Sequence, residues 1–139
     1  MEQLIKEVVS AETFEAEVRQ SELPVILAVT SPFCPACDPI RPFVEELALM
    51  TQGHFQIVTI DPLDDGFNYK LIRKEMIEKH GIDIMPVLLF YLNGEQFEKP
   101  IVGPENIIMF ASSVADTLFR MHTGGPVACA GETSKVPTP

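Results

Sequence analysis

The sequence predicts an α/β fold with about five strands and about four helices, in the order β-α-β-α-β-α-β-β-α. Two observations support this prediction. Short runs rich in Val, Ile and Leu alternate with longer segments whose apolar residues recur at helical spacing, which is the pattern of strands alternating with helices. Near the end of the chain, Asn93-Gly94 separates two strand-like runs, and this dipeptide is a strong signal for a β-hairpin.

Strands are expected at residues 4–9, 25–30, 55–60, 87–92 and 96–102, and helices at residues 12–20, 35–50, 67–80 and 104–122. Ser10 can cap the first helix, which places Phe14 and Val18 on one face. Pro42 lies inside the second helix and should kink it, because proline lacks an N–H and clashes with the preceding turn. Gly81 should end the third helix.

The last two helices should each bury an apolar face. In the third, Leu71, Ile72 and Met76 are expected to point inward. In the fourth, the apolar positions at helical spacing are Ile107, Phe110, Ala111, Val114 and Leu118. We interpret the charges of the third helix as a solvated face, with a partner-docking face as the alternative; they are Arg73, Lys74, Glu75, Glu78 and Lys79.

The length of 139 residues fits one domain able to bury a core, which we place at residues 1–122. Residues 123–139, rich in small residues and proline, are predicted to form a flexible tail. A net charge of −10 argues against nucleic-acid binding, and no run reaches the roughly 20 apolar residues that cross a bilayer. The charged N-terminus lacks the apolar core of a signal peptide, so we expect a cytoplasmic protein unless a leader precedes Met1.

The segment Cys34-Pro35-Ala36-Cys37 lies between a predicted buried strand and a predicted helix, which is the layout of a dithiol redox site. Cys34 would lie at the helix N-terminus, where unpaired N–H groups and the helix dipole favour an anion. The thiolate is the nucleophile in thiol–disulfide exchange, so this position favours reactivity. Two intervening residues keep Cys37 close enough to close a disulfide.

Two other interpretations of the cysteine pair are weaker. Structural zinc needs four ligands, whereas the remaining candidates are Cys129 and the scattered His54, His80 and His122. We therefore expect no metal and no cofactor beyond the redox-active pair, and a free thiol at Cys129. A pair of inert buried thiols would not need Pro35, which presets the backbone for a helix start.

Between residues 4 and 122 the sequence resembles thioredoxins. The matching features are the cysteine pair after the second strand, Pro42 five residues after Cys37, Ile60-Asp61 at the end of the third strand, Met85-Pro86 before the fourth strand, and Gly103 after the fifth. The resemblance implies a thioredoxin-like fold of three layers, with a central mixed sheet between the helices.

The resemblance also implies roles for individual residues. Cys34 would be the attacking thiolate and Cys37 the resolving thiol. A cis bond at Pro86 would shape a loop that faces the cysteine pair and pairs with substrate backbone; an ordinary proline at a strand start is the alternative. Gly103 would let the substrate backbone approach, unless it is a simple turn glycine. The implied substrate-binding residues are Phe33, Pro35, Ala36, Met85, Pro86 and Gly103.

The sequence departs from the thioredoxin pattern at several positions. Phe33 stands where most thioredoxins have Trp, and Pro35-Ala36 stands where most have Gly-Pro. A proline directly after the first cysteine resembles glutaredoxins and periplasmic disulfide oxidants. The span between Asp61 and Pro86 is longer than in typical thioredoxins and lengthens the third helix.

The buried acid of thioredoxins is also missing. Ala28 stands where most have Asp, and Ile57 stands where its Lys partner lies, so two apolar residues replace a polar pair and no lone charge is buried. The base that deprotonates Cys37 is therefore open. Asp38 is one candidate, although a residue at a helix start is expected to face solvent.

The resemblance implies a cytoplasmic thiol–disulfide oxidoreductase that reduces disulfides in client proteins. Its partners would be those clients and a thioredoxin-reductase-type electron donor, with no nucleic acid and no membrane, and it would act as a monomer. One alternative is a disulfide-forming oxidant or isomerase, which Pro35 permits. A second is a non-catalytic thioredoxin-fold binding module, against which the two intact cysteines argue.

Overall fold

The computed structural model describes residues 5–63, 66–97 and 99–123. Six strands of this part form one sheet in the order β1-β3-β2-β4-β5, and β6 also pairs with β4. β1, β3 and β2 run parallel while β4 is antiparallel to β2, so the predicted mixed sheet is confirmed. The strands are β1 (Ile5–Val8), β2 (Val25–Val29), β3 (Gln56–Ile60), β4 (Val87–Leu92), β5 (Glu95–Gln96) and β6 (Ile101–Val102).

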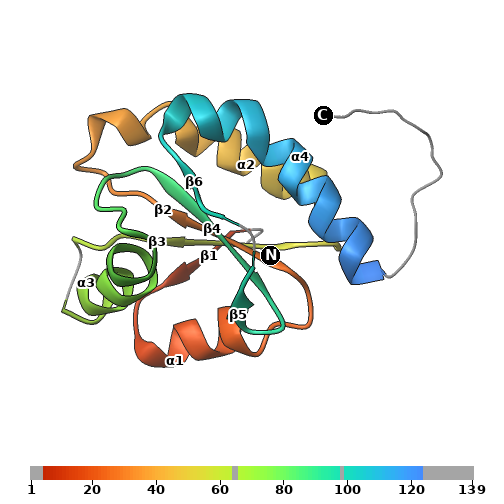
Figure 1. Ribbon diagram of the computed structural model, residues 1–139, viewed down its shortest axis with the longest axis horizontal. Helices are drawn as coiled ribbons and strands as arrows, with labels where there is room; N and C mark the ends of the chain where they lie inside the picture. The colour runs from red at the N-terminus through yellow and green to blue at the C-terminus, as the bar shows by residue number, and fades with distance from the viewer. Residues whose placement is uncertain (1–4, 64–65, 98, 124–139) are drawn as a thin grey trace.

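Helices cover both faces of the sheet, which gives the predicted three layers (Figure 1). Packed on one face are α2 (Ile40–Met50) and α4 (Pro104–Thr123). Packed on the other are α1 (Ala11–Phe14) with the π-helical η1 (Glu15–Arg19), and α3 (Gly66–Ile72) with the π-helical η3 (Arg73–Glu78). All five residues of β2 are buried, as expected for a central strand covered on both faces.

The first helix forms as its sequence predicts. The Ser10 hydroxyl caps it by accepting a 3.2 Å hydrogen bond from the Thr13 backbone N–H. Phe14 and Val18 are both buried against the sheet. They belong to the core cluster that also contains Leu71, Ile72 and Met76, which confirms the inward face of the third helix.

The predicted helix over residues 35–50 is interrupted, and the interruption is not at Pro42. A 3₁₀ turn, η2 (Pro35–Cys37), carries the second cysteine, and α2 starts only at Ile40. Pro42 is thus the third residue of α2. A helix leaves the N–H groups of its first turn unbonded, so proline there removes no hydrogen bond and needs no kink.

The Asn93-Gly94 turn is confirmed, with φ of 56° and 85° at its two residues. The strand predicted at residues 96–102 is instead two short strands, β5 and β6, on either side of Pro100. Proline has no N–H to donate to a ladder, which accounts for a break at this point.

The apolar face of α4 is narrower than predicted. Ile107 and Ala111 are fully buried, but Phe110 is 47% exposed. Phe110 lies between them on the helix and falls at the edge of the buried stripe, so its assignment to the core is wrong. The side chains of Val114 and Leu118 lie outside the described part of the structure, as do residues 124–139 of the predicted tail.

The longer third helix has a buried charge on the face that we expected to be solvated. Glu75 is 1% exposed, so its assignment to a solvated surface is wrong. Its carboxylate accepts hydrogen bonds from the Tyr91 hydroxyl on β4 and from the Gln96 amide on β5, at 2.8 and 3.1 Å. Lys79 and Arg19 approach the same carboxylate at 3.3 and 3.8 Å. Burial is tolerated because the charge is paired and hydrogen-bonded.

The first turn of α3 is hydrogen-bonded to the ends of two strands through Asn68, which is fully buried. Its Nδ2 donates to the carbonyl oxygens of Val8 and Asp61, at 3.2 and 3.1 Å. These carbonyls lie at the carboxyl ends of the parallel strands β1 and β3. Asn68 in α3 and Glu75 in η3 thus both bind this helical segment to the sheet. None of the described helices is long and apolar enough to span a membrane.

Candidate active site

Cys34 and Cys37 are joined by a disulfide, and their Cα atoms lie 5.3 Å apart. Cys34 is partly exposed whereas Cys37 is fully buried. The Cys34 residue is therefore in contact with solvent, whereas Cys37 is shielded from it.

Backbone hydrogen bonds fix the loop that carries the pair. The Cys34 N–H donates to the Ser31 carbonyl at 3.1 Å, and the Cys37 N–H donates to the Cys34 carbonyl at 3.0 Å. The buried Ser31 hydroxyl accepts a hydrogen bond from the Phe33 N–H at 3.2 Å. The loop is thus a series of turns, with Cys34 in extended backbone conformation just before η2.

The ends of β2, β4 and β6 that lie nearest the cysteines are next to one another in the sheet. Val29, the last residue of β2, pairs with Val87, the first residue of β4, and Val87 also pairs with Val102 of β6. The peptide bond between Met85 and Pro86, directly before β4, is cis. The Gly103 N–H, directly after β6, donates to the Pro86 carbonyl at 2.9 Å.

Gly103 has a positive φ of 91°, a conformation that side chains disfavour, and an added Cβ would meet no atom within 4 Å. The backbone geometry requires glycine here, and the space beside it is open. Both of the sequence-based interpretations of Gly103, a turn glycine and a position that substrate backbone can approach, are compatible with this geometry.

The residues predicted to bind substrate differ in exposure. Phe33 is 79% exposed, Pro35 and Ala36 are exposed, and Met85 is partly exposed, while Pro86 is buried. Ile84, which precedes Met85, is 56% exposed.

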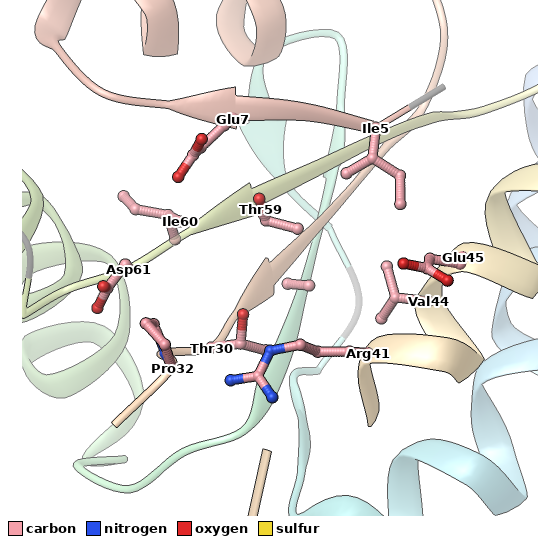
Figure 2. A pocket seen from close by; sticks show the side chains of 11 residues that line it. Ile5, Glu7, Thr30, Pro32, Arg41, Val44, Glu45, Thr59, Ile60 and Asp61 are labelled. Carbon is pink, nitrogen blue, oxygen red and sulfur yellow. The ribbon is translucent and has the colours of Figure 1, made fainter. Parts of the chain in front are cut away.

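A pocket of about 500 Å³ opens on the α2 face of the sheet, close to where β2 and β3 end (Figure 2). Ala28 lies in its lining, at the position where most thioredoxins have the buried acid. The neighbour of Ala28 on β3 is Thr59, and not Ile57, which pairs with Ile26. The pocket lining mixes apolar and polar side chains. The polar ones are Glu7, Thr30, Arg41, Glu45, Thr59 and Asp61.

Asp38, the candidate base for Cys37, is engaged elsewhere. Its carboxylate accepts a 2.6 Å hydrogen bond from Arg41, and its side chain is 68% exposed. This agrees with the expectation that Asp38 faces solvent. Arg41 itself was missed by the sequence interpretation, although opposite charges three residues apart are a known signal for a helical ion pair.

The described residues contain no group of three or more His, Cys, Asp or Glu side chains that could hold a metal ion. The two sulfurs, one partly exposed and one shielded, lie in a loop that backbone hydrogen bonds fix.

Comparison with known proteins agrees with this geometry. The family model described as Thioredoxin matches residues 5–115. The chain belongs to the thioredoxin family. It is a thiol–disulfide oxidoreductase with a Cys-Pro-Ala-Cys pair.

Individual thioredoxins are similar over most of the fold. Thioredoxin 1 of Nostoc sp. is 25% identical over 95 residues, which is 68% of this chain and 80% of the relative. The chloroplastic M-type thioredoxin of Pisum sativum is 31% identical over 95 residues, 68% of this chain and 51% of the relative. The crystal structure of Malassezia sympodialis thioredoxin (Mala s 13) superimposes with a TM-score of 0.61, at 16% identity, over 83% of this chain and 90% of that one.

Proposed function

We propose that this thioredoxin-family protein works in the cytoplasm as a reductant of disulfides in client proteins. The observation that carries the proposal is the division of exposure between the two sulfurs, with Cys34 accessible and Cys37 shielded. The exposed apolar side chain of Phe33 beside Cys34 supports a protein or peptide substrate, because it offers contact area next to the reactive sulfur.

The reaction would proceed in two exchanges. The Cys34 thiolate attacks one sulfur of a client disulfide, a Cys34–client disulfide forms, and the released client thiolate takes up a proton. Cys37 then loses its proton and attacks the Cys34 sulfur, which closes the Cys34–Cys37 disulfide and releases the second client thiol. Two electrons pass to the client, and a thioredoxin-reductase-type donor returns two electrons to the pair.

The loop from Met85 to Pro86 and the turn at Gly103 would hold the client strand. The Gly103–Pro86 hydrogen bond links these segments beside the first residue of β4. An extended client segment that lies along this edge would add backbone hydrogen bonds in the manner of an extra strand. The open space beside Gly103 supports such an approach.

Reduction of insulin disulfides, with dithiothreitol or a reductase as electron source, tests this proposal. Cys34→Ser should abolish catalysis. Cys37→Ser should still attack and accumulate a mixed disulfide with the client, because the resolving thiol is gone. A wild-type rate no higher than that of Cys34→Ser would instead favour a binding module, and alkylation of reduced Cys37 before Cys34 would reverse the two roles.

A further inference from the structure

The Arg41 side chain connects the two ends of the loop that carries the cysteines. Its Nη2 donates a 2.6 Å hydrogen bond to the Ser31 carbonyl, three residues before Cys34. Its Nη1 donates a 2.6 Å hydrogen bond to the Asp38 carboxylate, one residue after Cys37. Figure 2 shows the guanidinium reaching from α2 back toward Thr30, at the end of β2.

Arg41 is linked to Cys34 because both donate a hydrogen bond to the same acceptor, the carbonyl oxygen of Ser31. The Ser31 carbonyl accepts both the Arg41 guanidinium and the Cys34 N–H, and Ser31 is 1% exposed. Hydrogen bonds from a charged donor are shorter and stronger than those between neutral groups. Arg41 therefore anchors the acceptor that fixes the backbone of Cys34.

The contact with Asp38 balances charge. Between Ser31 and Pro42 the only charged residues are Asp38 and Arg41, so their charges sum to zero. The Asp38 side chain is 68% exposed, and a pair this exposed contributes little to stability. Its effect on the electrostatic field at the loop is larger, because removing Asp38 makes the loop one unit more positive and removing Arg41 makes it one unit more negative. Other acids on the pocket that Arg41 lines are Glu7, Glu45 and Asp61.

We propose that Arg41 is a positioning residue for thiol–disulfide exchange, which holds the cysteine loop through Ser31 and places a positive charge beside it that Asp38 offsets. Thiol–disulfide exchange uses the thiolate form of a reduced cysteine, whereas a disulfide carries no charge on sulfur. A positive charge near the loop therefore stabilises the dithiol state, and a negative charge stabilises the disulfide state.

Two substitutions separate this role from a purely structural one, because both break the same ion pair but leave opposite charges. Asp38→Asn should raise the equilibrium constant for reduction by glutathione about threefold or more, and Arg41→Gln should lower it by a similar factor. The rate of Cys34 alkylation by iodoacetamide at pH 6 should follow the same order, since it reports the thiolate fraction. Arg41→Lys should lie closer to wild type than Arg41→Gln because it keeps the charge.

A matched control is Arg73→Gln, which breaks the exposed Arg73–Glu78 pair on η3 and should leave both measurements within about twofold. Shifts of Asp38→Asn and Arg41→Gln in the same direction would overturn the proposal, as would shifts no larger than the control. If Arg41→Gln does not fold, Asp38→Asn is sufficient as a test. A decrease in its equilibrium constant for reduction and in its rate of Cys34 alkylation would overturn the proposal.

The proposal rests on exchange through Cys34 and Cys37, but not on its direction. Glutathione equilibrates with reductants and oxidants alike, so the charge effect can fail while insulin reduction persists, or hold while insulin is not reduced. The two failures are therefore distinguishable.

Discussion

The Tyr91 hydroxyl donates a 2.8 Å hydrogen bond to the carboxylate of Glu75, and both side chains are buried. Burial by itself raises the pKa of Glu75, but hydrogen bonds from Gln96 and Tyr91, together with the charge of Lys79, outweigh it and hold the pKa below its usual value. Burial, followed by the Glu75 carboxylate, raises the pKa of Tyr91. The carboxylate is therefore ionised and the phenol is neutral at pH 7.

Tyr91→Phe should lower the free energy of unfolding by about 1.5–3 kcal/mol, because a buried carboxylate loses a hydrogen-bond donor that nothing replaces. The matched control is Tyr69→Phe, because Tyr69 is 51% exposed and should change stability by no more than about 0.5 kcal/mol. Urea unfolding at pH 7 measures both. Equal effects of the two substitutions would contradict the role of the Tyr91–Glu75 bond.

Glu75→Gln should remove an acid-sensitive part of the stability. The folded pKa of Glu75 lies below its unfolded value, so its ionisation stabilises the fold above the unfolded pKa, and this contribution is lost as pH falls through the folded pKa. The difference in unfolding free energy between wild type and Glu75→Gln should thus be largest near pH 7 and shrink below about pH 4.

Unfolding measured from pH 7 to pH 3 tests this, with the exposed Glu46→Gln as the control variant. A difference between wild type and Glu75→Gln that stays constant or grows in acid would show that the carboxylate is not the stabilising group.

These buried contacts mark the limit of what the sequence predicted. The alternation of strand and helix patterns and the cysteine pair follow from local composition, and both were predicted correctly. Glu75 was not, because its helical segment is charged throughout, and nothing local distinguishes a charge facing water from one facing Tyr91 and Gln96. Those partners lie 16 and 21 residues away in the sequence.

The same limit applies beside the active site. Pro42 was expected to kink a continuous helix, but the chain instead starts a new helix at Ile40, a choice that depends on the turns around Cys37. The position of Arg41 follows from this helix start. Arg41 is the second residue of α2, and its side chain donates a hydrogen bond to the carbonyl of Ser31, ten residues earlier.

Phe33→Ser should raise KM for an insulin-like client without a comparable loss of stability. Phe33 is 79% exposed, so little core packing is lost, whereas the contact surface beside Cys34 is reduced. Met50→Ser is a suitable control because Met50 is 66% exposed at the C-terminal end of α2, away from the cysteines. Steady-state insulin reduction with both variants measures this. If Phe33→Ser had the same KM as Met50→Ser but a lower free energy of unfolding, the role of Phe33 would be structural instead.

Ala28→Asp should destabilise the fold in a pH-dependent manner. Ala28 is fully buried, so burial would raise the folded pKa of the new acid above its unfolded value, and stability would fall as pH rises through the interval between them. At pH 7 the variant should be roughly 2–4 kcal/mol less stable than Ala28→Asn, and near pH 4 the two should converge. Parallel stability curves from pH 4 to pH 7 would mean that an acid at this position remains well solvated.

The reduction potential of the Cys34–Cys37 couple, measured by equilibration with glutathione, tests the proposed reductant role most directly. A protein that reduces client disulfides in the cytoplasm must hold a potential near that of the thiol pool and of thioredoxins, so we predict roughly −230 to −290 mV. A potential above about −180 mV, in the range of disulfide isomerases, would contradict the account and favour a disulfide-forming oxidant.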